Sequence, residues 1–188
     1  YSPDRFVPGG AAAGVILQNV TEGSAYNTRN TQLDALQFGV NVASTVRSYV
    51  VETIVDNPFD AIANPQDFQN FGFFIGTGDQ DNYVKLVAGA NGGPGFEVLF
   101  ENAASSVSQK YAAPIFGPGS GVTSYDTITM RMLVDPGAGT VTPSWSWTAG
   151  RTQTLPGQTF SNTGATIVLT GDVLKAVQGT YSITPNVP

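Results

Sequence analysis

Two glutamates stand four residues apart in the pentad EVLFE, at Glu97 and Glu101. Apolar and polar residues alternate around them, and this pattern predicts a β-strand over 95–101. Because side chains alternate along a strand, both carboxylates point to the same face. A retaining glycoside hydrolase needs such a pair, one as nucleophile and one as acid/base. The pentad therefore predicts either a sugar-cleaving pair or the charged outer face of a sheet.

Composition removes several other kinds of chemistry. The chain of 188 residues has no cysteine and no histidine, which excludes disulfides, thiolate metal sites and a Ser-His-Asp triad. A net charge of -6 disfavours nucleic acid as a partner. There is no apolar run of membrane-spanning length, so we expect no membrane insertion. Charged residues make up only 12% of the chain, which favours an extracellular protein, secreted or anchored at a cell surface.

Short alternating runs bounded by Gly, Pro, Asn and Asp clusters are typical of half-buried antiparallel strands. The predicted strands are 13–20, 34–42, 46–55, 71–76, 82–89, 95–101, 106–111, 126–134, 139–148, 164–170 and 178–184. The stretch GDVLKAVQG, 171–179, predicts one helical turn with Asp172 as a candidate N-cap. We expect one all-β domain over 1–188, a two-sheet antiparallel β-sandwich or jelly roll, cut from a larger multidomain protein.

Alternation also predicts which residues leave the core. The apolar residues expected to point inward are Val84, Leu86, Phe96, Val98, Phe100, Ile128, Met130, Met132 and Val134. If the three strands are neighbours, their outward faces bring together Tyr83, Lys85, Glu97, Glu101, Thr129 and Arg131. Such a mixture of planar and charged groups resembles the floor of a sugar cleft, although opposite charges also pair across ordinary solvated sheets.

Two further features leave alternatives open. Trp145 and Trp147 share one face of a predicted strand with Val141, so they are either core residues or a platform for stacking sugars. Three oxygen-bearing side chains, Asp79, Asp81 and Asn82, crowd one tight turn. They suit a structural Ca²⁺ ion, or an Asx turn closed by the same oxygens.

Three stretches resemble the concanavalin A-like lectin/glucanase superfamily: FGFFIGTGDQDNYVKLVAG, GFEVLFE and TITMRMLVDPGAGTVTPSWSW. More narrowly, they are similar to bacterial surface and secreted domains of laminin-G or DUF1349 type. The resemblance covers roughly residues 30–148. It implies a jelly roll, a sugar site on the concave sheet or its rim loops, and often a structural calcium ion.

The resemblance sharpens the question of catalysis. Glucanases of this superfamily carry E-x-D-x-E or E-x-D-x-x-E on one strand, whereas here Leu99 stands where the central Asp is expected. Without that acid, nothing obvious tunes a nucleophile. A lyase using Tyr83 as its base, with Lys85 or Arg131 neutralising a uronate, is a fainter alternative because the histidine motif of those enzymes is absent.

We therefore expect non-catalytic carbohydrate binding, as an accessory or adhesion module of a bacterial protein. The expected partner is a polysaccharide or cell-surface glycan, and the residues expected at the sugar site are Tyr83, Lys85, Glu97, Glu101, Arg131, Trp145 and Trp147. We expect a monomer or part of a multidomain chain. Two alternatives remain: a retaining hydrolase using Glu97 and Glu101, and a structural spacer or protein-interaction module.

Overall fold

A computed structural model describes residues 6–8, 15–17, 20–37, 39–43, 45–56, 69–89, 95–111, 125–149 and 157–180. The strands are β1 (Phe6–Pro8), β2 (Val15–Leu17), β3 (Tyr49–Asp56), β4 (Asn70–Gly76), β5 (Tyr83–Gly89), β6 (Gly95–Asn102), β7 (Ser105–Tyr111), β8 (Tyr125–Asp135), β9 (Thr140–Ala149), β10 (Thr159–Thr163) and β11 (Ile167–Val168). One short helix, α1 (Gly171–Val177), follows β11.

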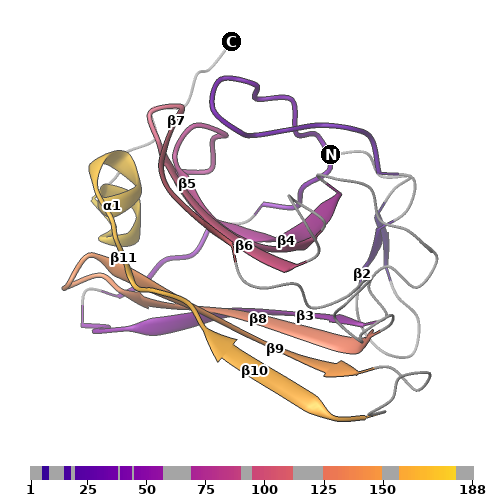
Figure 1. Cartoon of the computed structure of the whole chain (residues 1–188). Coiled ribbons are helices and arrows are strands. Elements are labelled where there is room, and N and C mark those ends of the chain that lie inside the picture. Colours follow the sequence, from indigo (N-terminus) through magenta and orange to yellow (C-terminus); the bar gives the residue numbers. More distant parts are fainter. Residues whose placement is uncertain are drawn as a thin grey trace.

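Two antiparallel sheets face each other, and the predicted β-sandwich is confirmed (Figure 1). The four-stranded sheet is a simple meander in the order β4-β5-β6-β7. The five-stranded sheet has the order β10-β9-β8-β3, and β11 also pairs with β9. A separate two-stranded sheet joins β1 to β2. The chain thus passes between the layers after β3 and again after β7.

The core lies between the two sheets and is built from the residues that alternation assigned to it. From the four-stranded sheet it receives Val84, Leu86, Ala88, Phe96, Val98 and Phe100, and from β8 it receives Ile128, Met130, Met132 and Val134, each no more than 5% exposed. Full burial of each such side chain contributes about 1.5–3 kcal/mol to the free energy of unfolding. The predicted inward sets are confirmed.

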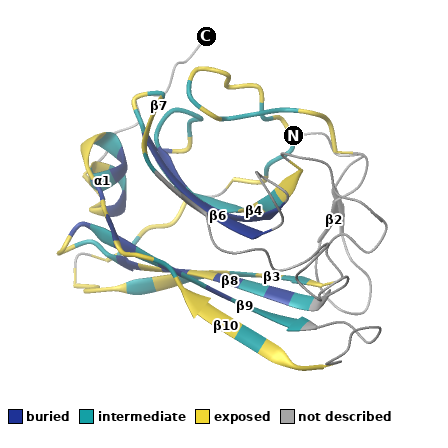
Figure 2. Ribbon diagram, viewed as in Figure 1, coloured by how far each residue is buried: buried dark blue, intermediate teal, exposed yellow. Residues whose placement is uncertain are grey.

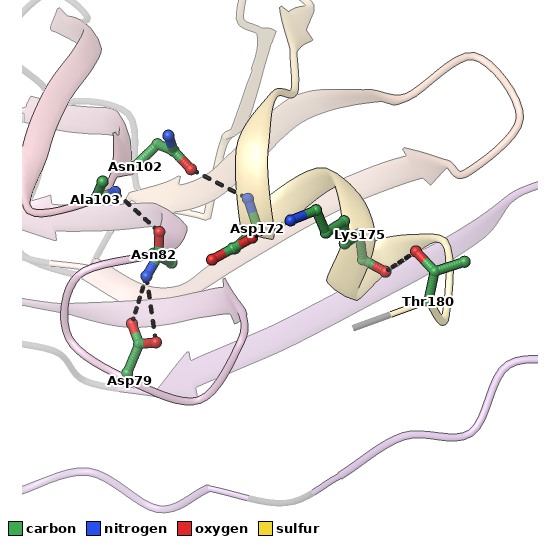
Figure 3. A network of polar contacts seen from close by, with 7 residues as sticks. All are labelled: Asp79, Asn82, Asn102, Ala103, Asp172, Lys175 and Thr180. Carbon is green, nitrogen blue, oxygen red and sulfur yellow. Dashed lines mark hydrogen bonds and ion pairs between the residues drawn. The ribbon is translucent and has the colours of Figure 1, made fainter. Parts of the chain in front are cut away.

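The predicted helix is also present, but its N-cap is Thr170 and not Asp172. Asp172 lies in the first turn, where its carboxylate accepts a hydrogen bond from Lys175 at 2.7 Å. The Asp172 N–H donates to the side-chain oxygen of Asn102 at 3.3 Å, which ties the helix to the end of β6 (Figure 3). Val173 and Val177 pack into the core.

Three predicted strands differ from the structure, and two observed strands were not predicted. No strand occurs among the described residues of 34–42, where Leu36 and Val40 are more than half exposed, so the alternation there does not reflect burial. The predicted strand 164–170 shrinks to β11. Residues 178–180 follow the helix without forming a strand, and 181–184 lie outside the described residues. Both β1 and β10 were missed; within β10, TFSNT, only Phe160 is a large apolar residue.

Candidate functional site

The residues predicted to form one sugar cleft lie in three separate places. Tyr83 and Lys85 on β5, together with Glu97 and Glu101 on β6, occupy the outer face of the four-stranded sheet. Arg131 lies on the outer face of the five-stranded sheet, because β8 pairs with β3 and β9 and not with β5 or β6. The two tryptophans face the interior. The expectation of three neighbouring strands is wrong, and with it the single cleft.

The predicted outward face of the four-stranded sheet is covered. Tyr83 is 3% exposed, Glu97 is 2% exposed and Glu101 is fully buried. Residues 24–32, which we call the strap, cover the Glu101 end of this face and lie on the side away from β8 and β9 (Figure 1). The direction of these side chains was predicted correctly, but their solvent exposure was not.

The strap is first closed on itself. The Thr31 N–H donates to the carbonyl oxygen of Ser24 at 2.8 Å, and the Ser24 N–H donates to the Thr31 hydroxyl at 3.0 Å. Asn27 and Asn30 have positive φ angles of 52° and 44°, a conformation in which asparagine is enriched. The strap is therefore a compact loop whose backbone bends around two asparagines.

Hydrogen bonds then fix the strap to the four-stranded sheet. The Asn27 N–H donates to Oε2 of Glu101 at 2.9 Å, and the Asn27 side-chain oxygen accepts from the Ser106 N–H at 3.0 Å. Asn30 donates to Asp81 at 2.6 Å. Gln32 and Gln80 exchange two hydrogen bonds, at 2.9 and 3.0 Å. The strap thus contacts β6, β7 and the turn before β5.

The two glutamates beneath this cover have different electrostatic environments. Glu97 forms an ion pair with Lys85, with 3.2 Å between Nζ and Oε1. Glu101 has the Asn27 N–H and the Tyr83 hydroxyl near Oε2, while its Oε1 is buried with no hydrogen-bond partner in the described part of the chain. Desolvation raises the pKa of Glu101, and burial together with the Glu101 charge raises the pKa of Tyr83.

The three residues of the predicted calcium turn hydrogen-bond within the protein. The Asp79 carboxylate accepts from the Asp81 N–H at 2.9 Å and from the Asn82 amide at 3.2 Å, which is an Asx turn (Figure 3). The Asn82 oxygen accepts from the Ala103 N–H at 2.9 Å. In the described part of the chain, no three His, Cys, Asp or Glu residues gather closely enough to hold a metal. Calcium binding stays a prediction.

The tryptophans belong to the interior side of β9. Trp145 is 5% exposed and stacks on Phe96 with ring centroids 4.9 Å apart. Trp147 stacks on Phe160 of the neighbouring β10 with ring centroids 5.2 Å apart, and its Nε1 atom is buried without a hydrogen-bond partner among the described residues. Of the two alternatives left open by the sequence, the core placement holds for both rings.

A shallow, open depression of about 510 Å³ lies over β8, β9 and β10. Its lining is made of Arg131, Ser144, Trp145, Ser146, Ser161, Asn162 and Thr163. Most of β10 is exposed, in contrast to the buried β6 (Figure 2). The sequence pointed to Arg131 and Trp145 but not to the hydroxyl residues. Ser144 and Ser146 lie on β9, a predicted strand, whereas Ser161 and Thr163 lie on β10, which was not predicted. The alternation in TVTPSWSWT, which places Thr or Ser at every second position, was the available signal.

Strand register aligns these hydroxyls in rows across the outer face of the five-stranded sheet. Arg131 pairs with Ser144, and Ser144 pairs with Thr163. The next row holds Thr129, Ser146 and Ser161. Because adjacent strands lie about 4.8 Å apart, each row presents regularly spaced donors and acceptors to solvent.

Arg131 is held at the edge of this array by an ion pair. Its Nε–H donates to Oε2 of Glu52, the residue directly opposite on β3. A guanidinium carries five N–H donors, so the four on its terminal nitrogens remain after this bond. The ion pair orients the guanidinium and balances its charge.

None of the described helices is long and apolar enough to cross a membrane. The chain matches no protein-family model, and neither a curated protein nor a solved structure is detectably similar to it. Its function has to be inferred from its own residues.

Proposed function

We propose that the protein binds a neutral carbohydrate without cleaving it, through the depression over β8, β9 and β10. The single observation that carries this proposal is the lining of that depression, which combines four hydroxyl side chains and one guanidinium on the outer face of the sheet. Sugar hydroxyls both donate and accept hydrogen bonds, and Ser and Thr offer both partners. Oriented polar groups on a fixed scaffold are what a glycan site requires.

The charge of the lining favours a neutral ligand. Arg131 is the one charged residue among those that line the depression, and Glu52 balances it. A site for an acidic polysaccharide would leave its cations uncompensated, so that they could pair with uronate groups. The net charge of -6 also opposes the approach of a polyanion.

The placement of the carboxylates supports binding over hydrolysis. A retaining hydrolase needs two carboxyl groups about 5–5.5 Å apart on either side of an accessible glycosidic bond. Here Glu97 is 2% exposed and paired with Lys85, and Glu101 is fully buried beside the strap. Among the described residues, no carboxylate lines the depression. The proposed setting remains the outside of a bacterial cell, as an adhesion or accessory module.

Affinity electrophoresis in gels containing neutral polysaccharides tests the proposal, with calorimetric titration of oligosaccharides from any gel that retards the protein. We expect retardation of the wild type. Arg131→Ala should weaken binding about tenfold or more, because a hydrogen bond from a charged donor contributes about 1.5–3 kcal/mol. Lys175→Ala is the matched control, since Lys175 is also ion-paired but lies on α1, away from the depression. Wild-type protein that no glycan retards would overturn the proposal.

A separate variant tests the preference for a neutral ligand. Glu52→Gln removes the balancing charge and leaves Arg131 in place. We expect this variant to gain retardation in a polyuronate gel that the wild type lacks, while it still binds the neutral glycan. Stronger binding of the wild type to polyuronate than to any neutral glycan would contradict the assigned ligand class and leave carbohydrate binding intact.

A further inference from the structure

The hydroxyl of Tyr83 has one proton but lies close to two acceptors. It is 2.9 Å from the carbonyl oxygen of Ala25 in the strap and 3.2 Å from Oε2 of Glu101. A phenol donates one proton, and neither a carbonyl nor an ionised carboxylate donates any. With Glu101 ionised, the single Tyr83 proton can be donated either to the Ala25 carbonyl or to Oε2 of Glu101. The other contact would then bring two oxygen atoms together with no proton between them. A proton on Glu101 removes the conflict, because Glu101 then donates to Tyr83 and Tyr83 donates to Ala25.

The second oxygen of Glu101 leads to the same conclusion independently. Oε1 is buried and has no hydrogen-bond partner among the residues that the structure describes. Removing water from one oxygen of an ionised carboxylate, with no hydrogen bond to replace it, carries a large cost in free energy. The same desolvation of a neutral carboxyl group costs far less. The closed strap thus fits a protonated Glu101 better than an ionised one.

We propose that the strap is a proton-linked latch, closed over the sheet while the carboxyl group of Glu101 is protonated and released as that group loses its proton at higher pH. Opening the strap would return the carboxylate to water and free the Asn27 N–H and the Ala25 carbonyl for solvent. The latch concerns the outer face of the four-stranded sheet, so it does not depend on sugar binding at the depression.

The groups that surround Glu101 and its partner Tyr83 come from several elements. β5 contributes Tyr83 and Lys85, the turn before it contributes Asp81, the strap contributes Tyr26, and β6 contributes Glu97; Ser106 of β7, beside Glu101 in register, does not titrate. Burial is the largest influence on Glu101 and raises its pKa, and the charge of Asp81 adds to this. The Asn27 and Tyr83 hydrogen bonds and the charge of Lys85 act in the opposite direction.

The sign of the pH dependence follows from this raised pKa. A carboxyl group that binds its proton more tightly in the closed state stabilises closure at acidic pH. That stabilisation is complete below the pKa of the open state and is lost as the pH rises through the pKa of the closed state. Within this window, the ratio of open to closed strap should rise by up to tenfold for each pH unit.

Amide hydrogen exchange of the full chain, followed by NMR at a series of pH values and corrected for intrinsic exchange, tests the latch. We expect the protection of the Asn27 amide to fall as pH rises, while the Leu86 amide in the centre of the sheet keeps its protection. In Glu101→Gln, the amide NH₂ group donates to Tyr83 as the carboxyl proton would, so Asn27 protection should stay constant with pH.

Asp81→Asn is the matched control, because it also neutralises a carboxylate that the strap contacts. It should keep the fall in protection and move it to lower pH. A flat wild-type profile, or the same fall in Glu101→Gln, would overturn the latch. A second measurement needs no variant: the carbon-13 chemical shift of the Glu101 carboxyl group, followed against pH in the wild type. A titration midpoint at the ordinary glutamate value would also overturn the latch.

Discussion

The two outer faces of the sandwich differ in what happens to residues that alternation directs outward. On the four-stranded sheet, Tyr83, Glu97 and Glu101 point away from the core and are nevertheless buried. On the five-stranded sheet, Val50, Ile54 and Leu133 point outward and remain 45–58% exposed, beside rows of hydroxyls. One face is a second interior containing charges, and the other is open to solvent, where we propose that a glycan binds.

This difference shows that direction and exposure are separate properties. The alternation of a strand fixes direction through local backbone geometry. Exposure depends on what covers the face, and here the cover includes a loop whose contact with Glu101 spans 74 residues of sequence. Carboxylates on a covered face act on stability and on closure of the cover, whereas hydroxyls on an open face are available to a ligand.

The largest expected effect on the free energy of unfolding comes from truncating one leucine on each face. Leu99 on β6 is fully buried and Leu133 on β8 is 45% exposed, although both point away from the core. Leu99→Ala should lower the free energy of unfolding by about 2–5 kcal/mol, as a core truncation does. Leu133→Ala should change it by no more than about 0.5 kcal/mol. Urea unfolding measures both, and equal losses would show that the two faces do not differ.

A smaller effect concerns the polar contacts of the covered face. Tyr83→Phe removes the hydroxyl between Ala25 and Glu101 and should lower the free energy of unfolding by about 1–3 kcal/mol, the cost of buried polar groups left without their hydrogen-bond partner. Tyr49→Phe is the control. Burial raises the pKa of Tyr49 also, so its ring is likewise partly removed from solvent, but its hydroxyl has no hydrogen bond with the described residues. Thermal unfolding compares the two, and a Tyr83→Phe variant as stable as the control would mean that the strap is held by other contacts.

The smallest expected change separates binding from stability on the open face. Ser146→Ala removes one hydroxyl from the depression and should weaken glycan binding about two- to tenfold, since a neutral hydrogen bond contributes about 0.5–1.5 kcal/mol. Its free energy of unfolding should stay within about 0.5 kcal/mol of the wild type. Ser105→Ala, an exposed serine of β7, serves as the control in the same titration. If both variants bind as the wild type does, the depression is not the glycan site.

Much of the fold was predictable because apolar alternation is strong in the sandwich centre. It placed Phe96, Val98, Phe100 and the β8 set inward, and the turn residues separated most strands. The alternation does not encode which strands pair, so Arg131 was assigned to the same face as Glu97 although it belongs to the other sheet. Nor does it encode the strap, because the burial of Glu101 depends on residues that are distant in sequence. β10 escaped prediction because Phe160 is its only large apolar residue.

The strap also bears on the order in which the molecule assembles. Asn27 contacts partners 74 and 79 residues further along the chain, in β6 and β7. During synthesis the strap leaves the ribosome long before its binding surface exists, and the entropy of closing so long a loop delays its docking until the meander has formed. The strap is synthesised soon after β2 but is thus among the last segments to dock.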